Sequence, residues 1–296
     1  MNIVLAMVRF RGNPILKPME HHRWESRYVF NPAAISLGGR VHILYRAMGE
    51  DMISRLGYAS SADGYQIDER LPEPVFIPAS SLDKCGCEDP RLTVIGGRCL
   101  MAYTAFGVIY QIGITSIPIE SILEKRWEWG ERLYPFPNVK NKNAVIFPRK
   151  INGSYVMLHR IDPNIYVAYS RDLRTWRYGY MLMGPRPGMW DCVKVGAAGP
   201  PIEVDGGWLL VYHGVDAGRV YRLGVALLDG DDPGRVAYRS EEPVLEPAED
   251  YERFGYVPNV VFSCGAVLLD SRLLIYYGAA DAVIGVADYD LNEIIP

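Results

Sequence analysis

The sequence predicts an all-β protein, a five-bladed β-propeller that spans residues 1–296 as a single domain. The first observation is a repeated pattern whose openings, near Asn31, Glu88, Asn143, Gly199 and Asn259, lie 57, 55, 56 and 60 residues apart. The second is a composition of 29 Gly, 21 Pro and 20 Tyr, which favours short strands and tight turns over long helices. Repeats of this length are typical of propellers, in which radial closure leaves only short, protected sheet edges.

Five segments share one pattern, in which a small or polar opening leads into an apolar strand, a tight turn and a second strand closed by an aromatic–polar pair. These segments are residues 31–47, 88–105, 143–160, 199–214 and 258–278. An extended stretch follows each of them and is expected to form the third strand of a four-stranded blade, at 55–64, 109–117, 165–176, 221–229 and 282–290.

Short turns are predicted between the first two strands of four repeats. They fall at Gly38-Gly39, Gly96-Gly97, Asn152-Gly153 and Gly206-Gly207, residue types that accept the positive φ of two-residue hairpin loops. A parallel βαβ fold would need helices between the strands, and only residues 116–129 have a helical pattern. A β-sandwich would not produce five units of similar period.

Composition and charge exclude several classes of protein. Hydrophobic residues make up 49% and the formal charge is −4, so the chain is neither disordered nor broadly basic, and no nucleic-acid partner is expected. No uncharged apolar stretch reaches the ~18 residues of a membrane span, and the N-terminal segment does not resemble a targeting signal. We therefore expect a cytoplasmic protein without a membrane partner; the sequence leaves the oligomeric state open, a homo-oligomer included.

The cysteines predict neither a metal site nor a disulfide framework. There are five of them, Cys85, Cys87, Cys99, Cys192 and Cys264, an odd and scattered set. Cys85 and Cys87 are separated by one residue and have no histidine near them in sequence. Reduced thiols, no metal and no organic cofactor are expected.

The repeats bring chemistry-bearing residues to one end of the central channel. Because the openings of the inner strands and the ends of the second strands converge there, we expect Asn31, Asp89, Asn143, Gly199 and Asn259 to lie near one mouth. The same reasoning gathers Arg46, Glu88, Arg91, Lys142, Arg160, Lys194, His213 and Asp281. Basic groups exceed carboxylates in this set, which predicts an anion of high charge density such as phosphate. Structural ion pairs for the arginines, a strand-end histidine at His213 and a turn role for Asp89 are the alternatives.

Several motifs resemble one enzyme family. The stretch EDPR at Glu88–Arg91, the segment ending in LHR at Arg160, GAAGPPI followed by VYHG, and PNVVFSCGA followed by YYGAAD occur in order. Over roughly residues 31–281 the sequence is similar to glycoside hydrolase family 130, whose members are inverting β-mannoside phosphorylases and a minority of hydrolases. The resemblance implies a five-bladed propeller that uses inorganic phosphate as co-substrate and releases α-mannose 1-phosphate.

The resemblance also implies roles for individual residues. Asp89 matches the catalytic acid, which can act through the 3-hydroxyl of the mannosyl unit. The phosphate-binding positions are Lys142, Arg160, Lys194 and His213. The sugar-binding positions are Asn31, Arg46, Glu88, Arg91, Asn143 and Asp281.

One acid and a basic cluster are chemically sufficient for phosphorolysis. An inverting hydrolase needs a second carboxylate to activate water, whereas phosphate is already an anionic nucleophile. A hydrolase on the same fold and a non-catalytic sugar-binding propeller are the two rival interpretations. Aromatic side chains that could stack on sugars are Tyr103, Tyr134, Trp190, Tyr212 and Tyr256, with Tyr103 taken as a substrate contact.

Overall fold

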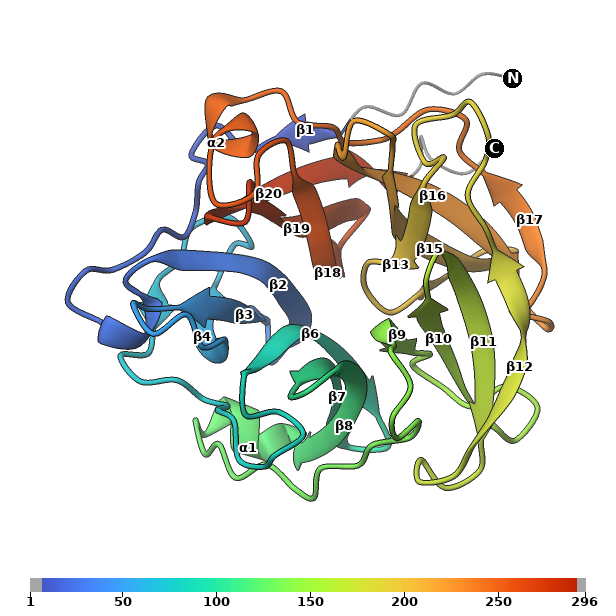
Figure 1. The fold of residues 1–296 in the computed structure, drawn as a ribbon, viewed down its shortest axis with the longest axis horizontal. Coiled ribbons are helices and arrows are strands. Elements are labelled where there is room, and N and C mark those ends of the chain that lie inside the picture. Colours follow the sequence, from blue (N-terminus) through green and yellow to red (C-terminus); the bar gives the residue numbers. More distant parts are fainter. Residues whose placement is uncertain (1–6, 292–296) are drawn as a thin grey trace.

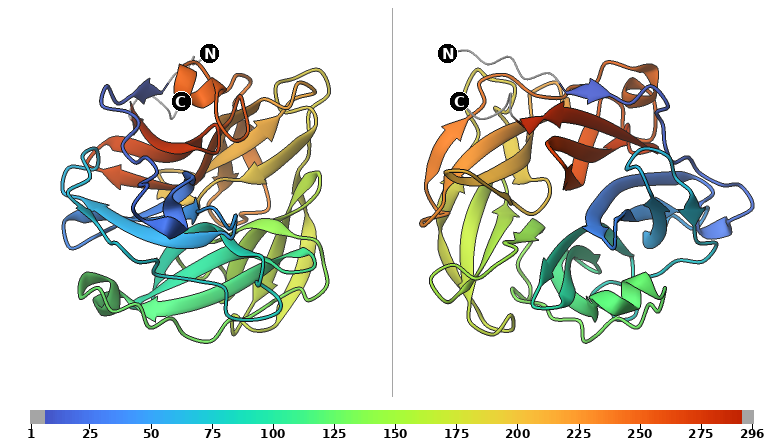
Figure 2. Two further views of the ribbon diagram at one scale, coloured as in Figure 1. Left: turned by 60° about the vertical axis from the view of Figure 1, so that its left-hand side comes forward. Right: turned by 180° about the vertical axis from the view of Figure 1, so that it is seen from behind.

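The computed structural model describes residues 7–291 and confirms the predicted all-β propeller. Strands make up 52% of the residues and helices 5%, and five sheets surround a central axis (Figure 1). When the molecule is turned by 60° or 180°, the five sheets remain distinct blades (Figure 2). Residues 1–6 and 292–296 lie outside the described residues, and with them both ends of the predicted domain and the start of the N-terminal segment considered for targeting.

Each blade is an antiparallel meander that begins at the axis and runs outward. The first blade contains β2 (Tyr28–Leu37), β3 (Arg40–Met48), β4 (Arg55–Ser61) and β5 (Glu69–Arg70). The second contains β6 (Gly86–Ile95), β7 (Arg98–Phe106) and β8 (Tyr110–Pro118). The third contains β9 (Lys142–Ile146), β10 (Tyr155–Ile161), β11 (Asn164–Ser170) and β12 (Trp176–Met183).

The last two blades follow the same plan. The fourth contains β13 (Lys194–Ala197), β14 (Ile202–Val204), β15 (Gly207–Val215), β16 (Tyr221–Asp229) and β17 (Val236–Arg239). The fifth contains β18 (Val261–Leu269), β19 (Arg272–Ala279), β20 (Val283–Asp290) and β1 (Val8–Arg9). The short helices η1 (Arg23–Glu25), α1 (Ile119–Leu123) and α2 (Asp250–Arg253) lie in connections between strands.

The second blade has three strands where four are expected. The segment that would supply the fourth strand forms one isolated bridge, between Leu133 and Ile114. Pro135 and Pro137 follow directly. Since proline has no N–H to donate to a ladder, the segment cannot continue as a paired strand.

The ring is closed by strand β1, which pairs with the outer strand β20 of the fifth blade (Figure 1). Val8 and Arg9 lie opposite Asp288 and Ala287. The guanidinium of Arg9 also donates to the fully buried Glu252, with Nε 2.8 Å from Oε1. A segment from near the start of the chain thus completes the blade formed by its end.

We expect Arg9→Ala to lower the free energy of unfolding by about 1–2 kcal/mol, a fall of roughly 2–8 °C in Tm. The range is discounted for solvent screening because the Arg9 side chain is 22% exposed, and Glu252 keeps other donors. Thermal unfolding measures the effect, with the exposed Arg11→Ala as control. Equal Tm values for the two variants would contradict a closing role for this pair.

The hydrophobic core lies between the blades, as the repeat pattern predicts. Five clusters of buried side chains each join two neighbouring blades. The alternating residues expected to make these contacts are all buried: Ile43, Leu100, Val156, Leu210 and Ile275. The glycine pair at the first hairpin has φ of 57° and 75°, as a two-residue turn requires.

The inner strands are interrupted by bulges at the repeat openings. Pairing shifts after Phe30 in β2, after Glu88 in β6 and between Lys142 and Val145 in β9. The residues at these points, Asn31, Asp89 and Asn143, have φ of 50°, 50° and 54°. Asn and Asp tolerate this left-handed conformation better than other residues with a side chain, which explains their presence here.

Strand register corrects the openings expected in the last two repeats. His213 lies opposite Gly196, and Gly278 opposite Phe262, so the equivalents of Asn31 are Ala197 and Ser263. Gly199 is two residues too late; it is buried, and a Cβ there would lie 3.1 Å from Gly265 Cα. Asn259 is four residues too early and exposed. The number of residues between the opening and the hairpin turn differs between blades, because bulges interrupt the inner strands.

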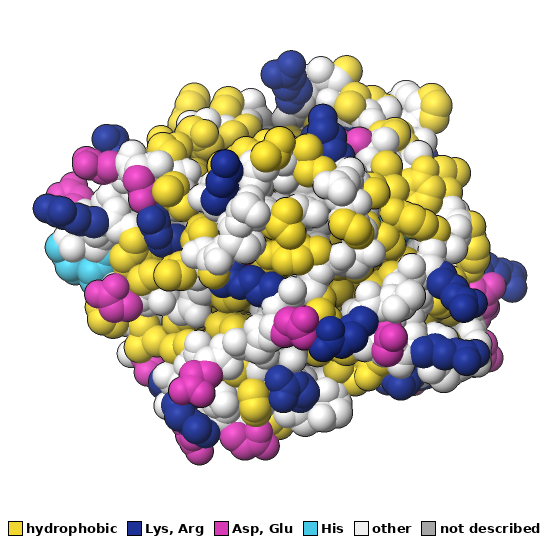
Figure 3. Space-filling model, turned by 60° about the horizontal axis from the view of Figure 1, so that its bottom comes forward, with side chains coloured by type: hydrophobic (Ala, Val, Ile, Leu, Met, Phe, Trp, Pro, Cys, Tyr) yellow, Lys and Arg dark blue, Asp and Glu magenta, His cyan; other side chains and the backbone are white. Residues whose placement is uncertain are grey.

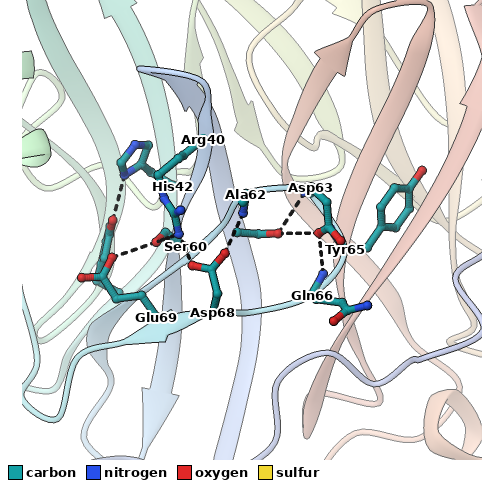
Figure 4. Close-up of polar contacts among 12 residues, drawn as sticks. Arg40, His42, Ser60, Ala62, Asp63, Tyr65, Gln66, Asp68 and Glu69 are labelled. Carbon is teal, nitrogen blue, oxygen red and sulfur yellow. Dashed lines mark hydrogen bonds and ion pairs between the residues drawn. The ribbon is translucent and has the colours of Figure 1, made fainter.

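The surface and the blade edges carry balanced charge. On the face shown in Figure 3, Lys and Arg side chains are interspersed with Asp and Glu. Ser60 of β4 donates to Glu69 of β5, and in the loop between these strands Asp63 accepts from the backbone of Tyr65 and Gln66 (Figure 4). Within residues 7–291, no helix combines the length and apolar character needed to cross a membrane.

Candidate active site

A cavity of about 660 Å³ lies where the five inner strands converge. Every blade contributes to its wall, and the volume is typical of a small-molecule site. The predicted site residues on this wall are Asn31, Arg46, Asp89, Lys142, Asn143, Arg160, Lys194 and Asp281. Residues that the sequence patterns missed are Tyr110, Lys140, Asn141, Ile161, Asp162, Tyr221, Val257, Val260 and Phe262.

Asp89 is the buried carboxylate at the centre of this arrangement. Its Oδ1 accepts from Asn31 Nδ2 at 2.9 Å and from Arg46 Nη1 at 3.2 Å. Arg91 lies beneath it, buried, and donates from Nη1 to the Asp89 carbonyl at 2.8 Å. Burial raises the pKa of Asp89, but the charges of Arg46, Lys142 and Arg91 outweigh it and hold that pKa below its usual value. Asp89 is therefore ionised at neutral pH.

Glu88 lies behind the cavity wall and positions two cations. Its Oε1 accepts from Arg46 Nη2 at 2.9 Å, and its Oε2 lies 3.2 Å from Lys142 Nζ. The Lys142 ammonium also lies 3.9 Å from the centre of the Tyr110 ring. Glu88 acts on the cavity through these neighbours, since it is not part of the wall.

The basic residues of the third and fourth blades converge as predicted. Arg160 and Lys194 share the cavity wall with Lys142, although they come from distant parts of the chain. Arg160 is also paired through Nε with Asp162 Oδ1 at 2.7 Å. The wall carries five basic side chains and three carboxyl groups, so a net positive charge faces the cavity.

His213 lies behind Arg160 and does not line the cavity. Its Nε2 is 3.1 Å from Arg160 Nη1. Since a guanidinium only donates, Nε2 accepts, and the neutral ring carries its proton on Nδ1, which has no partner. Burial and the charges of Arg160, Arg91 and Lys194 lower the pKa of His213 well below its usual value. Its geometry is that of a group that orients Arg160.

Tyr103, like Glu88 and Arg91, is a predicted substrate contact that is not part of the cavity wall. It is buried between the first two blades, with its ring 5.0 Å from that of Phe76 and its hydroxyl 3.4 Å from Asp83 Oδ2. Side chains alternate between the two faces of a sheet, and the Tyr103 side chain lies on the face that packs against the first blade. The aromatic–polar motif predicts where the strand ends, but it does not show on which face of the sheet the tyrosine side chain lies.

Two asparagines of the cavity wall carry acceptor oxygens that have no partner among the described residues. The Oδ1 atoms of Asn31 and Asn143 are buried and have no hydrogen-bond partner. A Cβ at Gly278 would lie 2.5 Å from Asn31 Oδ1, and one at Gly196 would lie 3.0 Å from Asn143 Oδ1. These glycines leave room for the two amides, whose oxygens are buried against them.

The pKa of Asp281 is shifted in the opposite direction to the pKa of Asp89. Burial raises its pKa to about 7; Arg46 lowers it, whereas Asp89 and Glu88 raise it further. Two carboxyl groups in one cavity thus differ in protonation, a feature common at functional sites.

Asp281→Asn is expected to become progressively more stable than the wild type as pH rises from 5 to 8. Asp281 binds its proton more tightly when folded than when unfolded, so it contributes stability at low pH that is lost as pH rises through about 7. One pKa unit corresponds to about 1.4 kcal/mol, so the Tm difference should grow by at least about 2 °C. Asn suits the left-handed φ of 51° at this position. Thermal unfolding of both proteins across this range is the test, and a Tm difference independent of pH would contradict it.

An axial cavity that combines one ionised carboxylate, a second carboxyl of raised pKa and a cluster of cations defines a β-propeller enzyme. The chain belongs to glycoside hydrolase family 130, since the family's sequence profile, described as β-1,4-mannooligosaccharide phosphorylase, matches residues 7–296.

Three similar proteins give this membership more detail. A 1,2-β-oligomannan phosphorylase and a β-1,2-mannobiose phosphorylase of Thermoanaerobacter sp. (strain X514) are 42% and 43% identical to this chain. Each alignment covers 98% of this chain and 99% of the relative. A solved structure has a TM-score of 0.89 and 30% identity, covering 97% of this chain and 94% of its own. It is described as showing that the family of mannoside phosphorylases contains glycoside hydrolases that target β-1,2 mannosidic linkages in Candida mannan.

Proposed function

We propose that this protein catalyses inverting phosphorolysis of β-linked mannosides. A phosphate oxygen attacks the anomeric carbon, the glycosidic bond breaks, and the departing oxygen takes a proton, giving α-mannose 1-phosphate and a shortened acceptor. The observation that carries the proposal is the convergence of Lys142, Arg160 and Lys194 on one cavity with Asp89. Such a basic cluster can hold the anionic nucleophile in place, so that attack needs no second carboxylate.

We assign the proton to Asp89, delivered directly or through the 3-hydroxyl of the mannosyl unit. Lys142 is one of the cations that keep Asp89 ionised, and it is also one of the groups whose charge phosphate would neutralise. Phosphate binding is therefore expected to raise the pKa of Asp89, so that the acid form gathers in the complex. Asn31, Arg46, Asn143 and Asp281 are proposed to hold the sugar.

The two Thermoanaerobacter relatives favour β-1,2-mannobiose as the first substrate to test, with β-1,4-linked mannosides second. Hydrolysis is the second candidate function, favoured by the solved structure described above. We further propose that the enzyme acts in the cytoplasm, where its five free cysteines would stay reduced.

The decisive experiment incubates β-1,2- and β-1,4-mannobiose with the protein, with and without inorganic phosphate, and measures mannose 1-phosphate and free mannose. We expect mannose 1-phosphate to form only when phosphate is present. Equal release of free mannose in both conditions would favour hydrolysis. Binding of either disaccharide without turnover would favour a non-catalytic sugar-binding protein.

A further inference from the structure

Four blades contain the same buried ionic group. A fully buried carboxylate precedes the inner strand and accepts from the tyrosine of the aromatic–polar pair and from an arginine. We call this group the blade triad. Its members are Glu25, Tyr45 and Arg70; Asp83, Tyr103 and Arg132; Asp191, Tyr212 and Arg239; and Glu252, Tyr277 and Arg9. Each triad joins the segment that precedes the inner strand to the rest of the same blade.

The third blade replaces this charged triad with a neutral pair. His159 takes the position that tyrosine has in the other blades, and its side-chain partner is the neutral amide of Asn141 where theirs is a carboxylate. Asn141 stands two residues before Asn143, whereas Glu25, Asp83 and Asp191 each stand six residues before the equivalent position of their blade. The amide nitrogen and oxygen of Asn141 lie 3.0 and 3.2 Å from His159 Nδ1. In residues 7–291 no arginine bonds to either side chain; the rings of Phe136 and Tyr178 lie 4.9 and 6.0 Å from the His159 ring. Burial lowers the pKa of His159 to about 4, so the pair is uncharged at neutral pH.

Asn141 differs from the triad carboxylates in place as well as in charge, because it directly precedes the inner strand β9. Asn141 lines the cavity, whereas the four triad carboxylates do not, among the residues described. It directly precedes Lys142, and its backbone N–H donates to the Tyr110 carbonyl at 3.2 Å. A carboxylate here would place a negative charge beside Lys142, on the wall that faces the proposed phosphate.

We propose that Asn141 determines specificity for the anionic co-substrate, because its neutral amide, held by His159, fixes the Lys142 segment without a negative charge on the cavity wall. The proposal rests on the phosphorolytic function given above. In the other blades the anchor can be ionic because its charge lies away from the cavity. In the third blade the same anchor would compete with phosphate for the cations.

The test is Asn141→Asp, which keeps size and shape and adds the carboxylate of the other blades. At pH 8 we expect the phosphate KM to rise at least about tenfold, while kcat and the mannoside KM change less than about threefold. The uncharged Asn141→Ala should raise the phosphate KM much less. Asn152→Asp, the same substitution at an exposed turn of the same blade, should change nothing.

A pH profile separates charge from shape. In Asn141→Asp the new carboxylate should raise the pKa of His159, and protonation of the ring would cancel the added charge. The ratio of variant to wild-type phosphate KM should therefore fall between pH 8 and pH 6. The other titratable groups facing the pair are Tyr166, Tyr178, Tyr110, Lys140 and Lys142, none of which is altered.

Two outcomes would overturn the proposal: an unchanged phosphate KM in Asn141→Asp, or an equal rise in Asn141→Ala. If Asn141→Asp cannot be purified, Lys140→Glu places a negative charge on the same wall from an exposed position, and an unchanged phosphate KM there is equally contrary. A wild-type rate that ignores phosphate would instead refute the proposed function. In that case the variants can still be compared by the rise in Tm that phosphate causes in the absence of mannoside.

Discussion

Asp89→Asn is expected to lower turnover of β-mannosides by about 10²–10⁴-fold, the usual contribution of a general acid. An amide keeps the size of the side chain and can still meet Asn31 and Arg46, but it has no acidic proton to give. The fold should persist because Asn occupies the equivalent bulges at Asn31 and Asn143 with the same left-handed φ. The measurement is the rate of mannose 1-phosphate release at saturating phosphate and mannoside.

Asp172→Asn is a suitable control for this variant. Asp172 is exposed and accepts backbone hydrogen bonds in a turn, so its replacement should leave turnover unchanged. If Asp89→Asn keeps more than a tenth of wild-type activity, Asp89 is not the acid. If the proton passes through the sugar, a 3-deoxy-mannoside should be turned over as poorly by the wild type as the natural substrate is by Asp89→Asn.

The blades were predictable from the sequence because each repeat carries its own local signals. Apolar alternation and the paired residues at Gly38-Gly39 and Gly96-Gly97 determine strands and turns without reference to the rest of the chain. Convergence of Asp89, Arg160 and Lys194 then follows from radial closure alone. The repeats therefore predicted a site formed by residues that are distant in sequence.

What the sequence did not reveal depends on side-chain direction and on tertiary packing. The bulges shift the register, so turn spacing misplaced the openings at Gly199 and Asn259. His213 and Arg160 belong to equivalent positions, yet only Arg160 reaches the cavity, because it lies between His213 and the open space. Tyr110 and Asn141 were missed for a similar reason, since they lie at strand ends outside the repeated motif. The KNKN stretch at 140–143 was the available signal for Asn141.

The second large effect is expected from Lys194, the cation of the proposed phosphate cluster with the fewest alternative roles. It stands at the start of β13, its ammonium lies 5.3 Å from the centre of the Tyr221 ring, and no carboxylate lies within ion-pair distance in the described part of the chain. Arg160, by contrast, is held by Asp162 and His213. Removing Lys194 therefore leaves no buried acid without its partner, and its effect on phosphate can be measured with little structural disturbance.

Lys194→Ala should raise the phosphate KM by about 10- to 150-fold, because a charge-assisted hydrogen bond contributes ~1.5–3 kcal/mol and ~1.4 kcal/mol is a factor of ten. Arg160→Ala should act in the same direction. The mannoside KM should change much less, since phosphate and sugar lie on opposite sides of the bond being formed.

Lys150→Ala is the matched control: its ammonium lies 4.5 Å from the Tyr155 ring centre, but on the exposed surface. The experiment measures rate against phosphate concentration at saturating mannoside. An unchanged phosphate dependence in Lys194→Ala would exclude this residue from the phosphate site and, with a phosphate-independent wild type, would make hydrolysis the better account of this cavity.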